Sequence, residues 1–325
     1  MPMRSPRSST CLILAAASRA AAMSTVTSSP AKGGLWSETA IKAAKGFTVS
    51  ARKNLAEQGA LDVKRPIRII GEPLDSAEKA MRDTGRAPAP GRTSKIIHFQ
   101  RHGQGFHNLI CDMMRDHGLP IDFDSSDPKL NPCVREELLD PPLTELGRRQ
   151  CSGQRFGCAM LSPELVIASP MLRCIQTAKL SFGDHLDVPW VAHEGCREEL
   201  GLLVGNKRRP LSEISADYPE IDYSAMEEYE ADVLWEEYGD ERRETVLEKS
   251  ERIYKFLTEY VMNRPEREIA IVCHSAYLFT LLNAVMDVED EELRSWFLTS
   301  EVRSLRMEFE LPENSSDDSF MRVVG

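Results

Sequence analysis

The feature that most constrains the fold is an alternation of short β-rich runs with longer amphipathic segments after residue 93. The runs rich in Val, Ile and aromatic residues predict strands at 95–99, 164–169, 189–194, 268–274 and 302–311. Helices are predicted at 143–160, 170–181 (with Ser169 as N-cap and Pro170 in the first turn), 241–263 and 275–286. This alternation predicts an α/β fold of three layers, in which helices flank a mostly parallel sheet whose last strand pairs antiparallel at an edge.

The first 36 residues differ in composition from the rest of the chain. Four basic residues, and many Ser, Thr and Ala residues, precede the first acidic residue, Glu38. A basic, acid-free segment is typical of organelle import, so we expect residues 1–36 to be a targeting peptide for a plastid or mitochondrion. Two alternatives stay open: a secretory signal built on "CLILAAA", and a start at Met23 that would leave the protein in the cytoplasm.

The next segment indicates an N-terminal extension. Helix formers and apolar residues alternate over 37–62, with Ser37 as a plausible N-cap, and "TGRAPAPGRTS" has the Gly, Pro and Ser content of a linker. The predicted organisation is a targeting peptide over 1–36, a helical extension and linker over 37–92, a main domain over 93–315 and a tail over 316–325.

Composition excludes several classes of protein. A hydrophobic content of 42% in 325 residues is enough for a packed core. The formal net charge of -11 argues against nucleic-acid binding, which needs clustered Lys and Arg. The apolar stretch 275–286 is too short to span a bilayer, so no membrane association is predicted. The cysteines form no CxxC pair, which favours buried free thiols. The sequence does not indicate an oligomeric state.

Three predicted strands run directly into sequence rich in Arg and His: "QRHGQGFHN", "SPMLRCIQTA" and "HSAYL". Because parallel strands end at the same edge of a sheet, these segments should meet there. The site that they would form contains Arg101, His102, Asn108, Arg173 and His274. Guanidinium groups match phosphate oxygens, and helix N-termini add partial positive charge. A phosphoryl group is therefore the expected ligand.

Such a site has the groups needed to transfer a phosphoryl group. A neutral imidazole nitrogen can attack phosphorus and form a phosphohistidine, and a second histidine can donate to the oxygens on which charge develops. The departing oxygen also needs an acid. The segment "EGCREELG", after the third predicted strand, offers Glu194, Glu198 and Glu199.

These segments resemble the histidine phosphatase superfamily, which has the phosphoglycerate mutase-like fold. "RHGQGFHN" is similar to its RHG signature, "LTELGRRQ" to its helix opener, "SPMLRCIQTA" to its second arginine motif and "IVCHSAYL" to its second histidine motif. The motifs occur in the family's order over roughly residues 95–290. The resemblance implies that 93–315 is a catalytic domain that acts on a small phosphorylated substrate without a metal or other cofactor.

Carried over position by position, the resemblance makes His102 the phosphorylated nucleophile. It assigns the rest of the phosphate-binding core to Arg101, Arg173 and His274, and the lining of the pocket to Gln104 and Asn108. "CREELG" resembles the family's glutamate-before-glycine pattern, which makes Glu198 the proton donor, with Glu199 as the alternative.

Other positions are expected to contact the substrate. The segment 205–224 resembles plant and fungal phosphoglycerate mutase-like proteins, and its basic run could clamp an anionic substrate tail or be a surface turn that offsets nearby acids. The residues predicted to bind substrate are Lys207, Arg208, His107 and Ser275. At position 275 many members of the family have Gly. His98, within a strand, is expected in the core, and the spacing of the histidines does not predict a metal site.

The segment after Asn108 favours one activity over another. True mutases follow the signature with a short substrate loop, whereas here a long, acidic, Pro-punctuated insertion intervenes over 109–142. We therefore expect a phosphomonoester hydrolase that acts through phosphohistidine on a small anionic metabolite. The alternatives are a phosphoglycerate or phosphosugar mutase, and an inactive phosphate-binding module.

Overall fold

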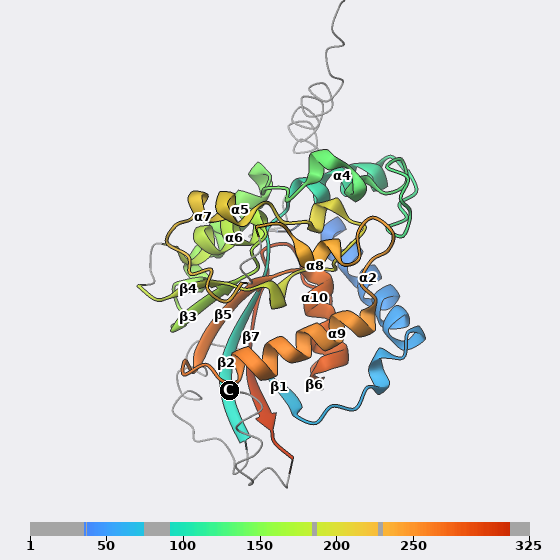
Figure 1. The fold of residues 1–325 in the computed structure, drawn as a ribbon. Coiled ribbons are helices and arrows are strands. Elements are labelled where there is room, and N and C mark those ends of the chain that lie inside the picture. Colours follow the sequence, from blue (N-terminus) through green and yellow to red (C-terminus); the bar gives the residue numbers. More distant parts are fainter. Residues whose placement is uncertain (1–35, 37, 75–91, 184–186, 227–229, 313–325) are drawn as a thin grey trace, which may run out of the picture.

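The computed structural model describes residues 36, 38–74, 92–183, 187–226 and 230–312 (Figure 1). The targeting peptide predicted over 1–36 lies outside these ranges except for Trp36. The predicted N-cap Ser37, most of the predicted linker and the predicted tail also lie outside the described residues.

A seven-stranded mixed sheet forms the centre of the molecule (Figure 1). Its order is β4-β3-β5-β2-β7-β1-β6. The strands are β1 (Arg68–Leu74), β2 (Arg92–Arg101), β3 (Leu165–Ala168), β4 (Trp190–Ala192), β5 (Glu268–Cys273), β6 (Asp287–Val288) and β7 (Val302–Glu310). The neighbours from β4 to β2 pair parallel, β6 pairs parallel with β1, and β7 is antiparallel to both β2 and β1.

Helices cover both faces of this sheet, which gives the predicted three layers (Figure 1). The helices are α2 (Glu38–Glu57), α4 (Phe106–Asp116), α5 (Glu145–Cys158), α6 (Leu172–Phe182), α7 (Leu211–Asp217), α8 (Val233–Glu236), α9 (Val246–Lys255) and α10 (Ser275–Thr280). The last two continue as π-helical turns over Phe256–Val261 and Leu281–Val285.

Alternation of side chains along the strands divides the core in two. One set of strand residues packs with α9 and α10, and the opposite set packs with α5, α6 and α7. On β5, for example, Ile269 and Ile271 belong to the first core and Ala270 and Val272 to the second. Both faces of the parallel strands are therefore buried, which explains their nearly continuous apolar sequence.

Two predictions about the sheet were wrong. The last strand, β7, does not lie at an edge, because β1 and β6 continue the sheet beyond it. β1 lies in the segment predicted as extension and linker, yet it pairs with β7 along its whole length, from Arg68 to Leu74. The sheet therefore begins well before residue 93, and the extension supplies part of the main fold.

Helix starts show how local sequence sets the boundaries. The side chain of Thr144 accepts from Gly147 N at the start of α5, and Thr245 forms a capping box with Glu248 at the start of α9. The predicted N-cap of α6 was wrong by two residues, because Met171 occupies that position. Ser169 is thus available for another contact.

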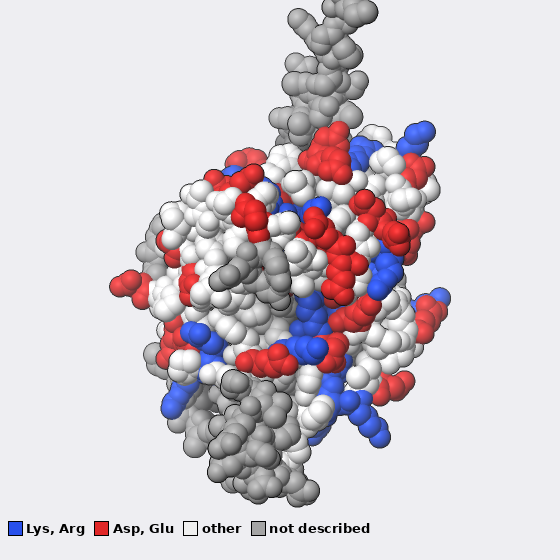
Figure 2. Space-filling model, in the orientation of Figure 1, with Lys and Arg blue, Asp and Glu red and all other residues white. Residues whose placement is uncertain are grey.

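The described residues bear on the predictions about cysteines, membrane-spanning helices and charge. All seven cysteines from Cys111 to Cys273 are free and buried, as predicted. Of the helices that the structure describes, none combines the length and apolar character needed to cross a bilayer. Acidic and basic side chains are interspersed over the face drawn in Figure 2.

Candidate active site

Strand pairing brings the predicted motifs to one edge of the sheet. Arg101, the last residue of β2, lies opposite Cys273, the last of β5, and Ala168 at the end of β3 lies opposite Val272. The residues that follow stay in register, because His102 N donates to Cys273 O at 2.9 Å and Ser169 N donates to Val272 O at 3.0 Å. The ends of β2, β3 and β5 thus present their side chains together.

Two glycines allow α5 to approach the strand end closely. A Cβ atom on Gly103 would lie 2.6 Å from Cys151 Sγ, and one on Gly147 would lie 2.2 Å from the carbonyl oxygen of Gln104. Ordinary side chains at either position would push the helix and the loop apart. This contact explains why the first motif and the helix opener both need glycine.

His102 is held in the form that a nucleophile requires. Its side chain is buried, and its Nδ1 lies 2.7 Å from the carbonyl oxygen of Gly103. A carbonyl can only accept, so Nδ1 carries the proton and the Nε2 lone pair is free. Burial lowers the pKa of His102 well below its ordinary value, and the nearby Arg173, His107 and Arg101 lower it further. The ring is therefore neutral at physiological pH.

Two guanidinium groups supply positive charge beside this ring. Arg173 is 1% exposed, and its Nη1 and Nη2 donate to Gly205 O at 2.8 Å and Asn206 Oδ1 at 2.9 Å. Arg101 Nη1 donates to Phe297 O at 2.7 Å. Burial lowers the pKa of Arg101 to about 10, so it stays charged at neutral pH.

Each of these arginines keeps one buried donor without a partner among the described residues, the Nε atom. A buried N–H that makes no hydrogen bond is costly, so a ligand that accepts from these groups would stabilise the site. Two such donors from positively charged groups favour an anion. The arrangement fits the phosphoryl group predicted from the sequence.

His274 lies beside His102, with ring centroids 5.2 Å apart. Arg173 Nη2 donates to its Nδ1 at 3.3 Å, which leaves the proton on Nε2, 2.9 Å from the hydroxyl oxygen of Ser169. Burial lowers the pKa of His274 well below its ordinary value, and Arg173 adds to the effect. His274 is thus neutral and held in one tautomer by two protein partners.

His107 also reaches this cluster. Its ring centroid lies 5.5 Å from that of His102, and its Nδ1 is buried without a partner among the described residues. Burial lowers the pKa of His107 well below its ordinary value, with Arg173 and Arg101 contributing. The structure therefore brings together His102, Arg101, Arg173, His274 and His107.

The two candidate proton donors have opposite environments. Glu198 accepts hydrogen bonds from the first turn of α10, from Ala276 N at 3.0 Å and Tyr277 N at 2.8 Å. Burial raises the pKa of Glu198, and the charge of Glu199 adds to the rise while Lys249 opposes it. Glu198 also interacts electrostatically with both Arg101 and Arg173, so its carboxyl group lies near these two arginines.

Glu199 is held elsewhere, by two cations. Lys249 Nζ donates to it at 2.7 Å and Arg243 Nη1 at 2.8 Å. Although burial opposes them, these cations lower the pKa of Glu199 to about 2. Glu199 is therefore ionised throughout the physiological range and unsuited to donate a proton, whereas Glu198 keeps this capacity.

The remaining predicted positions have structural partners, and their contact with substrate stays a prediction. Asn108 accepts from Gly105 N at 3.0 Å and so caps α4. Gln104 accepts from Thr144 Oγ1 at 2.9 Å. Ser275 is the buried first residue of α10. Lys207 lies over the ring of Trp235 and pairs with Glu236 at 3.2 Å.

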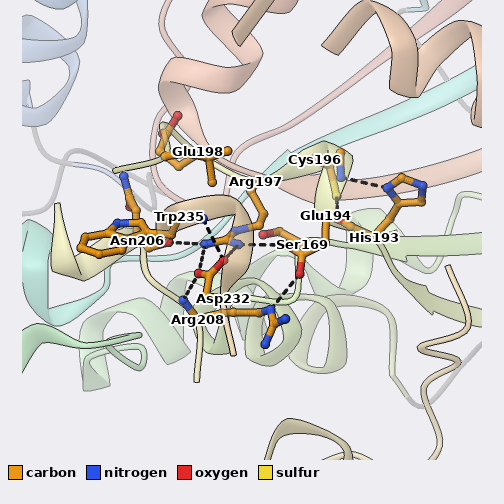
Figure 3. Close-up of polar contacts among 12 residues, drawn as sticks. Ser169, His193, Glu194, Cys196, Arg197, Glu198, Asn206, Arg208, Asp232 and Trp235 are labelled. Atoms are coloured by element: carbon orange, nitrogen blue, oxygen red, sulfur yellow. Dashed lines mark hydrogen bonds and ion pairs between the residues drawn. The ribbon is translucent and has the colours of Figure 1, made fainter. Parts of the chain in front are cut away.

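The contacts of Arg208 do not favour its predicted role in binding substrate, which stays a prediction. Its Nε donates to Glu194 Oε1 at 2.7 Å and its backbone N donates to Asp232 at 2.7 Å. Figure 3 shows these residues in one ionic cluster with Arg197, which donates to both oxygens of Asp232 at 2.6 Å. Arg208 is 4% exposed, so its charge is neutralised inside the protein.

Two residues that contact the central groups were not predicted to do so. Ser169 orients His274, and Asn206 binds the guanidinium of Arg173. Ser169 is the last residue of a predicted strand, which is a usable signal. Asn206 lies in an irregular segment, and no local pattern marks it.

The described residues contain no group of three or more His, Cys, Asp or Glu side chains arranged to hold a metal ion. His98, one of the closely spaced histidines, lies within the sheet instead, bonded to Ser304 Oγ at 2.7 Å and Glu268 Oε1 at 2.9 Å. Its burial confirms the prediction that it is a core residue.

Curated relatives share much of the chain. It is 31% identical over 252 residues to "Phosphoglycerate mutase-like protein 1" of Arabidopsis thaliana, covering 66% of this chain and 82% of that protein. It is 23% identical over 260 residues to "Probable phosphoglycerate mutase" of Arthroderma benhamiae, covering 76% and 75%. Among solved structures, a mycobacterial glucosyl-3-phosphoglycerate phosphatase matches at 20% identity with a TM-score of 0.38, covering 66% of this chain and 91% of that one.

A family model also matches directly. Residues 134–312, which include Arg173, Glu198 and His274, match the model of the histidine phosphatase superfamily (branch 1). This match alone covers more than half of the chain. The alignment with the Arabidopsis relative covers 66% of the chain. The chain therefore belongs to the histidine phosphatase superfamily.

Proposed function

We propose that this protein is a phosphomonoesterase that acts through a phosphohistidine at His102 on a small anionic phosphorylated metabolite. The observation that carries the proposal is the state of His102: its Nδ1 proton is bound to Gly103 O, its Nε2 is free, and its pKa is lowered. A neutral, oriented imidazole beside two cationic groups is the arrangement that attack on phosphorus requires.

The first chemical step transfers the phosphoryl group. Nε2 of His102 forms a bond to phosphorus while the ester P–O bond breaks. Glu198, whose pKa is raised by burial, acts in its protonated form and gives its proton to the departing oxygen. The unpartnered Nε–H groups of Arg101 and Arg173 stabilise the charge on the phosphoryl oxygens.

His274 would change partners in this step. An incoming phosphoryl group takes the Arg173 donor that now faces His274 Nδ1. The negative charge of the phosphoryl group favours uptake of a proton from water at His274 Nδ1, and this N–H donates to a phosphoryl oxygen. His274 returns the proton to water when phosphate leaves. Ser169 keeps the ring oriented throughout, through Nε2.

The second step releases phosphate. Water attacks the phosphorus of phospho-His102 and gives a proton to the Glu198 carboxylate. The P–N bond breaks, inorganic phosphate leaves, and both residues return to their starting forms. Apart from the substrate and the attacking water, every reacting group in the proposed cycle is a side chain of the protein.

The ion pairs of Lys207, Arg208 and Arg209 support hydrolysis over mutase activity. A mutase must hold the anionic remainder of its substrate while the phosphoryl group returns to it. Lys207 pairs with Glu236, Arg208 with Glu194, and Arg209 with Asp140 and Asp217. Protein carboxylates already neutralise these cations, so the cations are less able to hold the anionic remainder of a substrate.

The fate of a labelled phosphoryl group tests this proposal. Wild-type protein given a panel of small phosphomonoesters labelled at phosphorus is expected to release the label as inorganic phosphate. Chromatography of the products gives the ratio of phosphate to isomeric ester. Label recovered mainly in an isomeric ester would establish mutase activity instead, and unchanged ester throughout the panel would support an inactive binding module.

A further inference from the structure

We infer that Asn206 is a positioning residue that fixes the phosphate-binding arginine and the proton-donor loop relative to each other. The inference rests on the proposed function, since it assigns Arg173 and Glu198 to the same reaction. Asn206 is 8% exposed and lies in the short turn Val204–Asn206, between the strand-end residues and the ionic cluster drawn in Figure 3. Three of its atoms make contacts that matter here.

The first contact sets the orientation of Arg173. Asn206 Oδ1 and the adjacent Gly205 carbonyl accept from the two terminal nitrogens of the guanidinium, at 2.9 and 2.8 Å. Because the guanidinium is planar, holding both terminal nitrogens fixes the direction of the Nε–H group. The Nε atom is buried and has no partner among the described residues.

The other contacts hold the loop on both sides of Glu198. Asn206 Nδ2 donates to Glu199 O at 2.9 Å, and the carbonyl of Asn206 accepts from Arg197 Nη2 at 2.6 Å. Arg197 is in turn held by both oxygens of Asp232. In Figure 3 the side chain of Glu198 points away from this cluster, so the cluster anchors the backbone while the carboxyl group lies at the start of α10.

An asparagine side chain suits this position because one amide supplies an acceptor and a donor at once. Leucine has a similar size but neither group. Aspartate keeps an acceptor for Arg173 but has no donor for Glu199 O. Leucine therefore removes both contacts, whereas aspartate removes only the contact to the loop and adds a negative charge beside Arg173.

The test compares binding of orthovanadate, a phosphate analogue, with turnover of an alkyl phosphate ester, whose leaving oxygen needs a proton. Asn206→Leu is expected to weaken vanadate binding and to lower kcat, each on the order of 10²-fold, with little change in KM, because misplaced groups lose mainly transition-state contacts. Asn206→Asp is expected to lower kcat for the alkyl ester, because the contact to the loop is lost. It should also weaken vanadate binding, because its carboxylate offsets the charge of Arg173 in an anion site.

Asn131 offers a matched control. It is fully buried, its Oδ1 accepts from Cys133 N at 3.1 Å, and its Nδ2 donates to two backbone carbonyls, of Phe123 and Ser125. Asn131→Leu is expected to lower Tm without changing kcat or vanadate affinity of the folded protein. If it lowers both as strongly as Asn206→Leu does, Asn206 is only a structural residue and the inference fails.

The remaining outcomes also decide the question. Wild-type values of kcat and vanadate affinity in Asn206→Leu would overturn the inference. If that variant does not fold, Asn206→Asp, which is closest in shape, gives the answer: wild-type kcat in it would overturn the role in the loop. If wild-type protein binds vanadate but hydrolyses no ester, the proposed function is rejected. The vanadate affinities of the wild type and the Asn206 variants can then still be compared. Wild-type protein that binds no vanadate would overturn both.

Discussion

His102→Ala is expected to lower kcat for phosphomonoester hydrolysis by at least about 10⁴-fold, because the variant has no atom that can accept the phosphoryl group. The neighbouring histidines cannot replace it. His274 is bonded through both ring nitrogens to Ser169 and Arg173. His107 lies on α4 and not at the end of β2, with its ring centroid 5.5 Å from that of His102. The measurement is steady-state turnover of a phosphate ester, with circular dichroism to confirm folding.

His98→Gln is the matched control for this variant. His98 is also a buried histidine of β2, but its ring is bonded to Ser304 and Glu268 within the sheet. Its replacement is expected to lower Tm and leave kcat near the wild-type value. A His102→Ala protein that keeps more than about a tenth of wild-type kcat would contradict the covalent mechanism, since no other described group occupies the nucleophile's position.

Glu198→Gln is expected to lower kcat for an alkyl phosphate by about 10²- to 10⁴-fold, the usual contribution of a positioned acid. The loss should be smaller for p-nitrophenyl phosphate in the first step, because that leaving group departs without a proton. A burst of p-nitrophenol followed by slow turnover is the expected time course. Equal losses for both esters in a rapid-quench experiment would show that Glu198 does not protonate the leaving group.

The dependence of kcat on pH tests the roles of Glu198 and His102 independently. The acid must be protonated, so kcat falls as the pH rises through the raised pKa of Glu198. The nucleophile must be neutral, and since the pKa of His102 is lowered, the loss of activity on the acid side comes well below the ordinary range of histidine. Glu198→Gln should abolish the alkaline decline.

Glu199→Gln is the control for this profile. The charge of Glu199 helps to raise the pKa of Glu198, and its loss also leaves Lys249 and Arg243 uncompensated. Both effects lower the pKa of Glu198, so the alkaline decline should persist and move to lower pH. An alkaline decline that survives in Glu198→Gln and disappears in Glu199→Gln would reverse the assignment of the acid.

The central groups of the site could be predicted because the sheet is locally parallel. Arg101 and His102 follow one strand and His274 another, and parallel strands end at the same edge. Arg173 follows a third strand within one turn of α6. Their approach follows from parallel strands in one sheet, which the alternation of strands and helices indicated, whereas the order of the strands was not predicted.

Long-range partners account for what could not be predicted. A basic run such as "KRR" resembles an anion clamp, but the partners of Arg208, at Glu194 and Asp232, are distant in sequence and give no local signal. β1 contains Gly71 and Pro73, which weaken the pattern of a strand. Gly71 is nevertheless suited to its place, since a Cβ there would lie 2.9 Å from side-chain atoms of both Met286 and Val288.

The central claim is a covalent bond between phosphorus and His102, and trapping it is the most direct test. Wild-type protein is mixed with a phosphomonoester labelled at phosphorus, quenched in denaturant within milliseconds and digested. Our account predicts label on the peptide that contains His102, lost in acid and retained in alkali as expected of a phosphohistidine, and absent in His102→Ala. Label on a different residue, or turnover in wild type with no protein-bound label at any time, would contradict it.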